Sequence, residues 1–298
     1  GCWGSDLCHD PFVLYGTLRF PCRLARVYHA SVLPGPRLDE RVRELLAKAE
    51  EGVKLYLDAE RAEGRIAENY AREALTHVLP NLLTWFTDRA IDRIDGKLRA
   101  GIADAIEAGR WEDIVNAYVR RATFSATGGI RAKMAPDKTS ILKLKSDGID
   151  ARILKGPNTL NNLVLLLTAG GVARYGKDHG FKKFVVGFDS RVRGRDLAGA
   201  IARLLLAEEF RVYFFDEACM FPSVTFAVPT LDADCGIFIS ASHNDYRYNG
   251  FKITAPNGGQ MENTVRNKMY DDYIMKMMPR DIRLLDFSGA PKYQLWFL

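Results

Sequence analysis

The chain has 298 residues, and 47% of them are hydrophobic, which is enough to form the buried cores of two modest domains. Its 42 lysine and arginine residues outnumber 37 aspartate and glutamate residues, so the net charge is +5. Because the basic residues are mixed with acidic ones and form no stripe, this charge suits a small anionic substrate, and we expect no nucleic-acid partner.

The five cysteines are scattered along the chain and form no Cys-x-x-Cys pair. An odd and irregular set is typical of reduced thiols in a cytoplasmic protein, and it fits neither a disulfide framework nor a zinc site. The longest apolar run, over 163–173, is short and contains two adjacent glycines. We therefore expect no membrane span and no membrane partner, and a cytoplasmic location.

The first part of the chain changes from an irregular to a helical pattern. Residues 1–37 contain a Pro-Gly-Pro break and no periodic pattern, so no element is predicted there. From Leu38 to Tyr118, apolar residues recur three and four positions apart in four successive stretches, the second of which is expected to end at Pro80. The sequence thus predicts an irregular and then helical region over 1–109, with a role in packing or oligomerisation.

Beyond Arg120 the pattern becomes that of a layered α/β fold. Short runs rich in β-branched and aromatic residues predict buried strands at 182–188, 211–215, 236–240 and 249–253. Longer amphipathic stretches predict helices at 160–175, 196–209 and 262–276. Helices that alternate with short buried strands are typical of an α/β sheet with at least partly parallel strands.

A polar loop follows the third predicted strand and contains Ser242, His243 and Asn244. Loops that follow the strands of an open α/β sheet form the crevice in which ligands bind. A serine beside an imidazole and an amide could support nucleophilic or phosphoryl-transfer chemistry. Ser-His-Asn runs also occur in ordinary turns, so the residue types alone leave both interpretations open.

Three motifs in this part of the chain resemble, in the same order, those of the α-D-phosphohexomutase family, which includes phosphoglucomutases and phosphomannomutases. They are TGGIR at 127–131, VVGFDSR at 185–191, and SASHN at 240–244 followed by NGFK at 249–252. The resemblance implies a three-layer α/β/α domain I with a mixed sheet over 110–280, preceded by the helical region. It also implies that 281–298 begin a linker to further domains.

The resemblance implies the activity of a sugar phosphomutase, an isomerase that acts as an intramolecular phosphotransferase. Such an enzyme interconverts a hexose or pentose 1-phosphate and its 6- or 5-phosphate. Ser242 would carry a phosphoryl group in the resting enzyme, donate it to the sugar phosphate and recover one from the bisphosphorylated intermediate. A sugar bisphosphate would be the activator, and Mg²⁺ would be the cofactor, bound here through the phosphate of Ser242 alone.

The same resemblance assigns roles to the residues around Ser242. Arg131 and Asn244 would bind the phosphate, for which the planar fork of an arginine is well suited. His243 and Lys252 would transfer protons or stabilise charge near the reacting hydroxyl. Arg191 matches an arginine of the strand-end motif, and a structural role is expected for it.

The sequence also departs from the family pattern. Asp245 replaces the usual proline and adds a negative charge near the expected phosphate, and Ala-Lys-Met at 132–134 follows Arg131 where glycine is common. The family's metal loop, Asp-Gly-Asp-x-Asp-Arg, does not occur in the sequence. The sugar-recognition loops of the later domains are also expected to be missing. We therefore expect the N-terminal part of a longer mutase that is inactive by itself.

Three other functions fit the sequence less well. A non-catalytic or regulatory module with the phosphomutase fold is favoured by the missing metal loop and opposed by Ser242, His243 and Lys252. A serine hydrolase would need a Gly-x-Ser-x-Gly elbow, and adjacent serine and histidine residues have poor geometry for a triad. A dinucleotide-binding enzyme would need a glycine fingerprint that Gly170-Gly171 does not provide.

Overall fold

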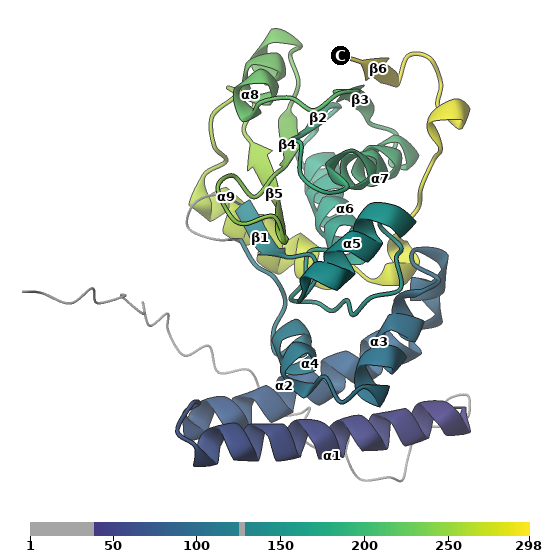
Figure 1. Ribbon diagram of the computed structural model, residues 1–298. Coiled ribbons are helices and arrows are strands. Elements are labelled where there is room, and N and C mark those ends of the chain that lie inside the picture. Colours follow the sequence, from purple (N-terminus) through teal and green to yellow (C-terminus); the bar gives the residue numbers. More distant parts are fainter. Residues whose placement is uncertain (1–38, 125–128) are drawn as a thin grey trace, which may run out of the picture. The chain divides into compact units, whose positions relative to one another are not determined.

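The computed structural model describes residues 39–124 and 129–298. The irregular region predicted at 1–37 therefore lies outside the described residues, as do Thr127 and Gly128 of the first motif. The first described part of the chain is helical, as predicted (Figure 1). Its elements are α1 (Glu40–Ala62), α2 (Glu68–Thr87), the 3₁₀ helix η1 (Arg89–Arg93), α3 (Leu98–Glu107) and α4 (Trp111–Tyr118).

The prediction that a helix ends at Pro80 is wrong. Helix α2 continues through Pro80 to Thr87, and the chain then forms η1 instead of one further long helix. Proline removes one helical hydrogen bond, but Val78 and Leu82 on either side of it are fully buried, and Phe86 extends the same apolar face. Burial of this face offsets the lost bond, because most helical stability in proteins comes from tertiary packing.

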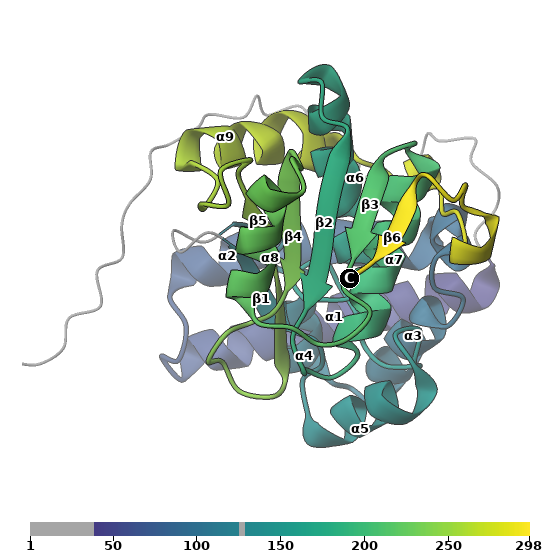
Figure 2. The same cartoon turned by 90° about the horizontal axis from the view of Figure 1, so that it is seen from above.

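The strands form one mixed sheet, seen from above in Figure 2. They are β1 (Gly129–Lys133), β2 (Lys183–Phe188), β3 (Arg211–Phe214), β4 (Cys235–Ile239), β5 (Tyr248–Thr254) and β6 (Leu295–Phe297). Their order is β1-β5-β4-β2-β3-β6. The neighbouring strands β4, β2, β3 and β6 pair in parallel, whereas β5 is antiparallel to both β4 and β1.

Helices cover both faces of this sheet. They are α5 (Lys138–Asp147), α6 (Asn162–Asp178), α7 (Gly194–Ala207), α8 (Phe221–Thr230) and α9 (Asn263–Lys268). Val186 and Ile237 belong to the core formed with α6 and α7, whereas Val185 and Phe238 pack with α8. Because alternate strand residues point to opposite faces, α8 covers the face opposite to α6 and α7. The predicted three-layer α/β/α fold with a mixed sheet is thus confirmed.

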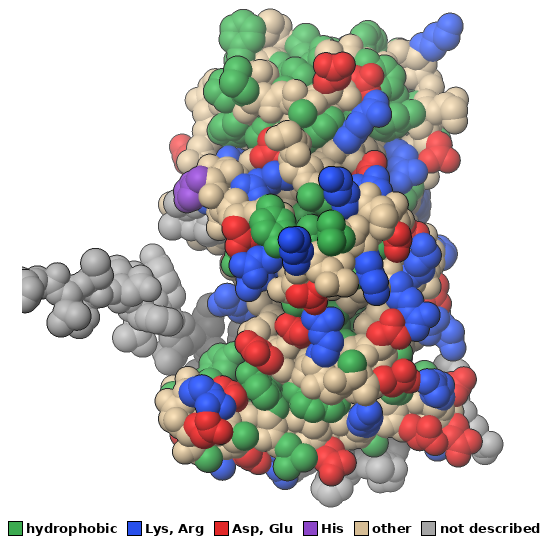
Figure 3. Space-filling model, viewed as in Figure 1, with side chains coloured by type: hydrophobic (Ala, Val, Ile, Leu, Met, Phe, Trp, Pro, Cys, Tyr) green, Lys and Arg blue, Asp and Glu red, His purple; other side chains and the backbone are tan. Residues whose placement is uncertain are grey.

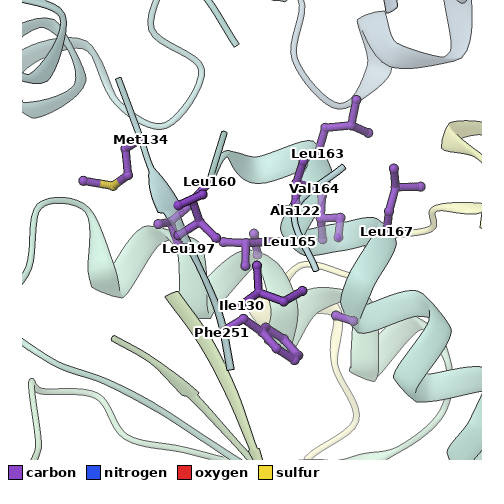
Figure 4. Packing of buried hydrophobic residues seen from close by; sticks show 14 of the residues in the cluster. Ala122, Ile130, Met134, Leu160, Leu163, Val164, Leu165, Leu167, Leu197 and Phe251 are labelled. Atoms are coloured by element: carbon purple, nitrogen blue, oxygen red, sulfur yellow. The ribbon is translucent and has the colours of Figure 1, made fainter. Parts of the chain in front are cut away.

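The antiparallel edge of the sheet is anchored on α6. Figure 4 shows Ile130 of β1 and Phe251 of β5 lying close to Leu165, and all three side chains are buried. The apolar run over 163–173 lies within α6, which is buried on nearly every side. Among residues 39–124 and 129–298, no helix is both long and apolar enough to cross a bilayer.

The helical region packs against the segment that precedes α6. Lys155 and Asp95 form an ion pair in which both side chains are buried. The hydroxyl of Tyr118 in α4 donates to the carbonyl of Lys155 at 2.6 Å. The helices and the α/β layers therefore share one hydrophobic core, and residues 295–297 add the edge strand β6. Where the domain boundaries lie stays a prediction.

Candidate active site

Ser242 lies exposed in the loop that leaves the carboxyl end of β4. Ser240 is buried, its N–H donates to the carbonyl of Gly250, and its Oγ accepts from the N–H of Ser242 at 2.9 Å. The Ser240 hydroxyl is thus used inside the protein, whereas the Ser242 hydroxyl faces outward. Ser242 has a φ of 56°, a left-handed conformation that a non-glycine residue keeps only when its surroundings impose it.

Arg191, which follows β2, holds this loop in place. Its two terminal nitrogens donate to four main-chain carbonyls of the loop, at distances from 2.5 to 2.9 Å; these belong to Ser242, Asn244, Asp245 and Tyr248. The N–H groups of both terminal nitrogens are thus bonded to main-chain carbonyls, which leaves this guanidinium little capacity to contact a ligand. The structural role expected for Arg191 agrees with this geometry.

Strand pairing brings Arg131 and Lys252 to the same face of the sheet. In the antiparallel pair β1–β5, Gly129 lies opposite Lys252 and Arg131 lies opposite Gly250. Paired residues share a face, as do residues two apart along a strand. The two cationic side chains therefore both project from the face that α8 covers, and neither points toward α6.

Asn244 links Arg131 to the Ser242 loop. Nη1 of Arg131 donates to Oδ1 of Asn244 at 3.2 Å, across 113 positions of sequence. The structure thus brings together two residues for which phosphate binding was expected. Arg131 does not line the cavity in which Ser242 lies, however, and borders a neighbouring one instead.

Lys252 lies among aromatic rings and other cations. Its Nζ is 4.6 Å from the centre of the Phe221 ring and 6.0 Å from that of Phe238. Partial burial lowers the pKa of Lys252, and the positive charges of Arg131 and Arg191 lower it further, while Asp189 raises it. The amine of Lys252 therefore loses its proton more readily than that of an ordinary lysine, as suits a group that exchanges protons.

His243 is exposed beside Ser242. Its Nδ1 lies 3.5 Å from Oγ of Ser242, at the outer limit of a hydrogen bond. The imidazole could thus reach the leaving oxygen of a phosphoserine with a small rotation. Among the described residues, no carboxylate contacts the histidine ring, so Ser242 and His243 do not form a hydrolase triad.

A cavity of about 700 Å³ connects Ser242 and Lys252, whereas His243, Asn244 and Arg131 do not line it. Ser242 and Lys252 line it together with Asp189 after β2, and with Phe221 at the start of α8. Sequence reasoning found the first two residues but missed Phe221, because α8 itself was not predicted. The available signal was Pro222, since proline is favoured in the first turn of a helix.

The two sequence departures near the site have local explanations. The carboxylate of Asp245 accepts from the N–H of Arg247 at 2.8 Å and from its guanidinium at 2.7 Å. The side-chain hydrogen bond from Arg247 is the main reason that the pKa of Asp245 falls to about 2. The added negative charge is therefore balanced within the loop. Ala132 and Lys133, which follow Arg131, continue strand β1, where glycine is not required.

The residues around Ser242 do not fit a bound Mg²⁺. Asp189 is the one carboxylate among the described residues that lines the cavity, and it already accepts from the N–H of Arg191 and forms an ion pair with its guanidinium at 3.5 Å. Among the described residues there is no group of three or more histidine, cysteine or acidic side chains that could hold a metal ion. Mg²⁺ prefers several oxygen ligands, and the described residues around Ser242 do not provide such a set.

Residues 142–277 match the family model described as phosphoglucomutase/phosphomannomutase, alpha/beta/alpha domain I. The chain carries a domain of this family. The matched residues include Ser242, His243 and Lys252 but not Arg131. The family inferred from the three sequence motifs is thereby confirmed, and the matched description agrees with the three layers seen in the structure.

Curated relatives of the phosphoglucomutase/phosphomannomutase domain cover only part of the chain. A phosphoglucomutase from Staphylococcus haemolyticus is 34% identical over 116 residues, which are 39% of this chain and 21% of the relative. A phosphoribomutase from Saccharomyces cerevisiae is 32% identical over 127 residues, which are 41% of this chain and 20% of the relative. The chain thus spans about a fifth of the length of these relatives.

Among solved structures, a phosphoglucomutase/phosphomannomutase family protein from Burkholderia thailandensis is similar, with a TM-score of 0.38 and 21% identity. The similarity covers 57% of this chain and 32% of that protein.

Proposed function

We propose that this chain supplies the phosphoserine-bearing domain of a sugar phosphomutase, which interconverts a hexose or pentose 1-phosphate and its 6- or 5-phosphate. The observation that carries the proposal is the placement of Ser242. Its exposed hydroxyl, held in a left-handed turn at a strand end, shares a cavity with Lys252. Through Asn244, the same loop is bonded to Arg131.

The proposed reaction begins with a phosphate on Oγ of Ser242. A hydroxyl of the bound sugar phosphate attacks the phosphorus, so that a new O–P bond forms while the bond from phosphorus to Oγ breaks. The attacking hydroxyl gives its proton to the neutral amine of Lys252, and His243 delivers a proton to the leaving Oγ. The resulting sugar bisphosphate reorients and returns its other phosphoryl group to Ser242 by the reverse step.

The charges around Ser242 suit this chemistry. Phosphoryl transfer needs alignment and neutralisation of spreading negative charge more than covalent assistance. Arg131 and Lys252 project from the same face of the sheet as the cavity, and Asn244 holds the Arg131 guanidinium toward the loop. A dianionic phosphoserine would thus meet the guanidinium of Arg131, and Lys252 would add a second positive charge once its amine has accepted the proton of the attacking hydroxyl.

Three parts of the proposal lie beyond this chain. Mg²⁺ and a sugar bisphosphate activator belong to the proposed reaction, but the carboxylates for the metal would come from further domains of a longer protein. Those domains would also bind the distal phosphate and the sugar hydroxyls.

We further propose a cytoplasmic location, which fits the odd number of cysteines and the sugar phosphate substrate.

A coupled mutase assay tests the proposal. This chain, a form extended to the length of its relatives, and the extended form with Ser242→Ala would be compared with Mg²⁺ and glucose 1,6-bisphosphate present. We expect turnover by the extended form alone, since loss of even one stabilising cation in phosphoryl transfer can cost about 10³-fold. Equal turnover by the short chain, or full activity of the Ser242→Ala form, would refute the proposal.

A further inference from the structure

A second cavity, of about 360 Å³, lies between α4 and β1 and does not include Ser242, His243 or Lys252. Its lining is polar and includes Arg120, Arg131, Lys133, Asn116, Asn158 and Tyr248. Figure 3 shows lysine and arginine side chains interspersed with acidic ones at the level of β1 and α5 in Figure 1. The sequence motifs gave no reason to expect a site here.

The three cations of this cavity form no salt bridge within the described residues, although the charge of Lys133 helps to lower the pKa of Asp245. Within residues 39–124 and 129–298, the structure pairs neither Arg120 nor Arg131 nor Lys133 with a carboxylate. Two acidic residues also line the cavity, but Asp113 is bound by Arg110 at 2.8 Å, which leaves Glu112 at the exposed mouth. The cavity therefore carries a surplus of positive charge that the described protein does not balance.

Arg131 also has an unused donor. Its Nη1 donates to Asn244, but its Nε is buried and has no hydrogen-bond partner in the described part of the chain. A buried donor without an acceptor is unfavourable unless a ligand supplies the acceptor. Because Arg131 and Lys133 are two residues apart on β1, their side chains leave the same face at about 6.6 Å spacing, close enough to contact one small anion.

We propose that this cavity binds a phosphate group, carried by free inorganic phosphate or by a small phosphate monoester. A tetrahedral dianion offers several acceptor oxygens to two arginine forks and a lysine, which a single carboxylate cannot match. The volume exceeds that of a bare ion, and the side-chain amide of Asn116 would face the remainder of an ester. The amide of Asn158 instead holds Arg120, accepting from its Nε at 3.4 Å, and donates to the carbonyl of Asn116 at 2.8 Å. The site is separate from the Ser242 cavity, although Arg131 also donates to Asn244 of the Ser242 loop.

Isotope-edited NMR titration of this chain tests the proposal, with inorganic phosphate in one arm and glycerol 3-phosphate in the other at constant ionic strength. The test variant is Arg120→Gln combined with Lys133→Gln. Both side chains are exposed, so the fold is expected to persist. The matched control is Lys54→Gln combined with Arg72→Gln, which removes the same charge from exposed positions on α1 and α2. Lys252→Gln reports on the other cavity.

We expect saturable shifts at the side-chain amides of Asn116 and Asn158, and at least tenfold weaker binding in the test variant. The control pair and Lys252→Gln should change the affinity by less than about twofold. Tighter binding of glycerol 3-phosphate than of phosphate would identify an ester as the ligand, and equal binding would identify the free ion. Absence of saturable binding would overturn the proposal. So would equal losses in the test and control pairs, or binding lost only in Lys252→Gln.

Discussion

Replacing Arg191 by alanine tests how the Ser242 loop keeps its conformation. The substitution removes four hydrogen bonds from a guanidinium to the carbonyls of the loop. A bond to a charged group contributes about 1.5–3 kcal/mol, but several of these carbonyls belong to exposed residues and would bind water instead. We therefore expect a loss of about 2–4 kcal/mol in the free energy of unfolding, well below the sum of four bonds.

Two further variants separate this effect from a general loss of charge. Arg191→Lys keeps the charge but offers one compact ammonium group, which cannot span four carbonyls, so it should restore less than half of the loss. Arg195→Ala removes an exposed arginine of α7 that is paired with Asp216. Exposed ion pairs contribute about 0–1 kcal/mol, and this control should stay within that range.

The assay combines urea unfolding with hydrogen exchange. The amide of Asn244 donates to the carbonyl of Ala241 and that of Tyr248 to the carbonyl of Asp245, so both report on the loop. In Arg191→Ala, we expect these amides to exchange faster than global destabilisation requires, whereas amides of β2 follow the global change. If Arg191→Ala resembled Arg195→Ala in both measurements, the clamp would not hold the loop and this reasoning would fail.

Other predictions concern groups around the same loop. Arg131→Gln should raise the pKa of Lys252, measured by NMR of the ¹³C-methylated amine, because a nearby positive charge is removed; an unchanged pKa would show that Arg131 does not contribute to lowering it. Asp245 should titrate at about 2, and nearer 4 in Arg247→Gln, so its stabilising contribution is present above pH 4 and is lost as the pH falls toward 2. Gly250→Ala should destabilise the protein by about 3 kcal/mol or more in urea unfolding, because the new Cβ would lie 2.3 Å from the carbonyl oxygen of Ser240, which directly follows β4; a change below 1 kcal/mol would contradict this packing.

The strands of the sheet centre could be predicted because their residues are buried on both faces. Runs such as 184–188 and 235–239 are continuously apolar, which is the pattern of central parallel strands. The edge strands β1 and β6 were missed for the opposite reason. Each is short and partly exposed, and its strand character depends on pairing with a distant segment, which no local pattern records.

In the candidate site, too, the residue types could be predicted from the sequence, but the contacts between distant segments could not. The motifs pointed to Ser242, Lys252 and Arg131, because each chemistry requires particular residue types. They could not show that Arg131 reaches Asn244, a contact across 113 positions. Nor could they show that Phe221 lies over the lysine, since α8 contains two prolines and was not predicted from its sequence.

The most direct test of the central claim is the location of the phosphate. The protein, extended to the length of its relatives, would be incubated with glucose 1,6-bisphosphate and Mg²⁺, digested, and the phosphopeptides mapped by mass spectrometry beside a Ser242→Ala control. We predict one phosphate on the peptide that contains 240–244, located on Ser242 and absent from the control. A phosphate on Ser240, or none on either serine, would contradict the account.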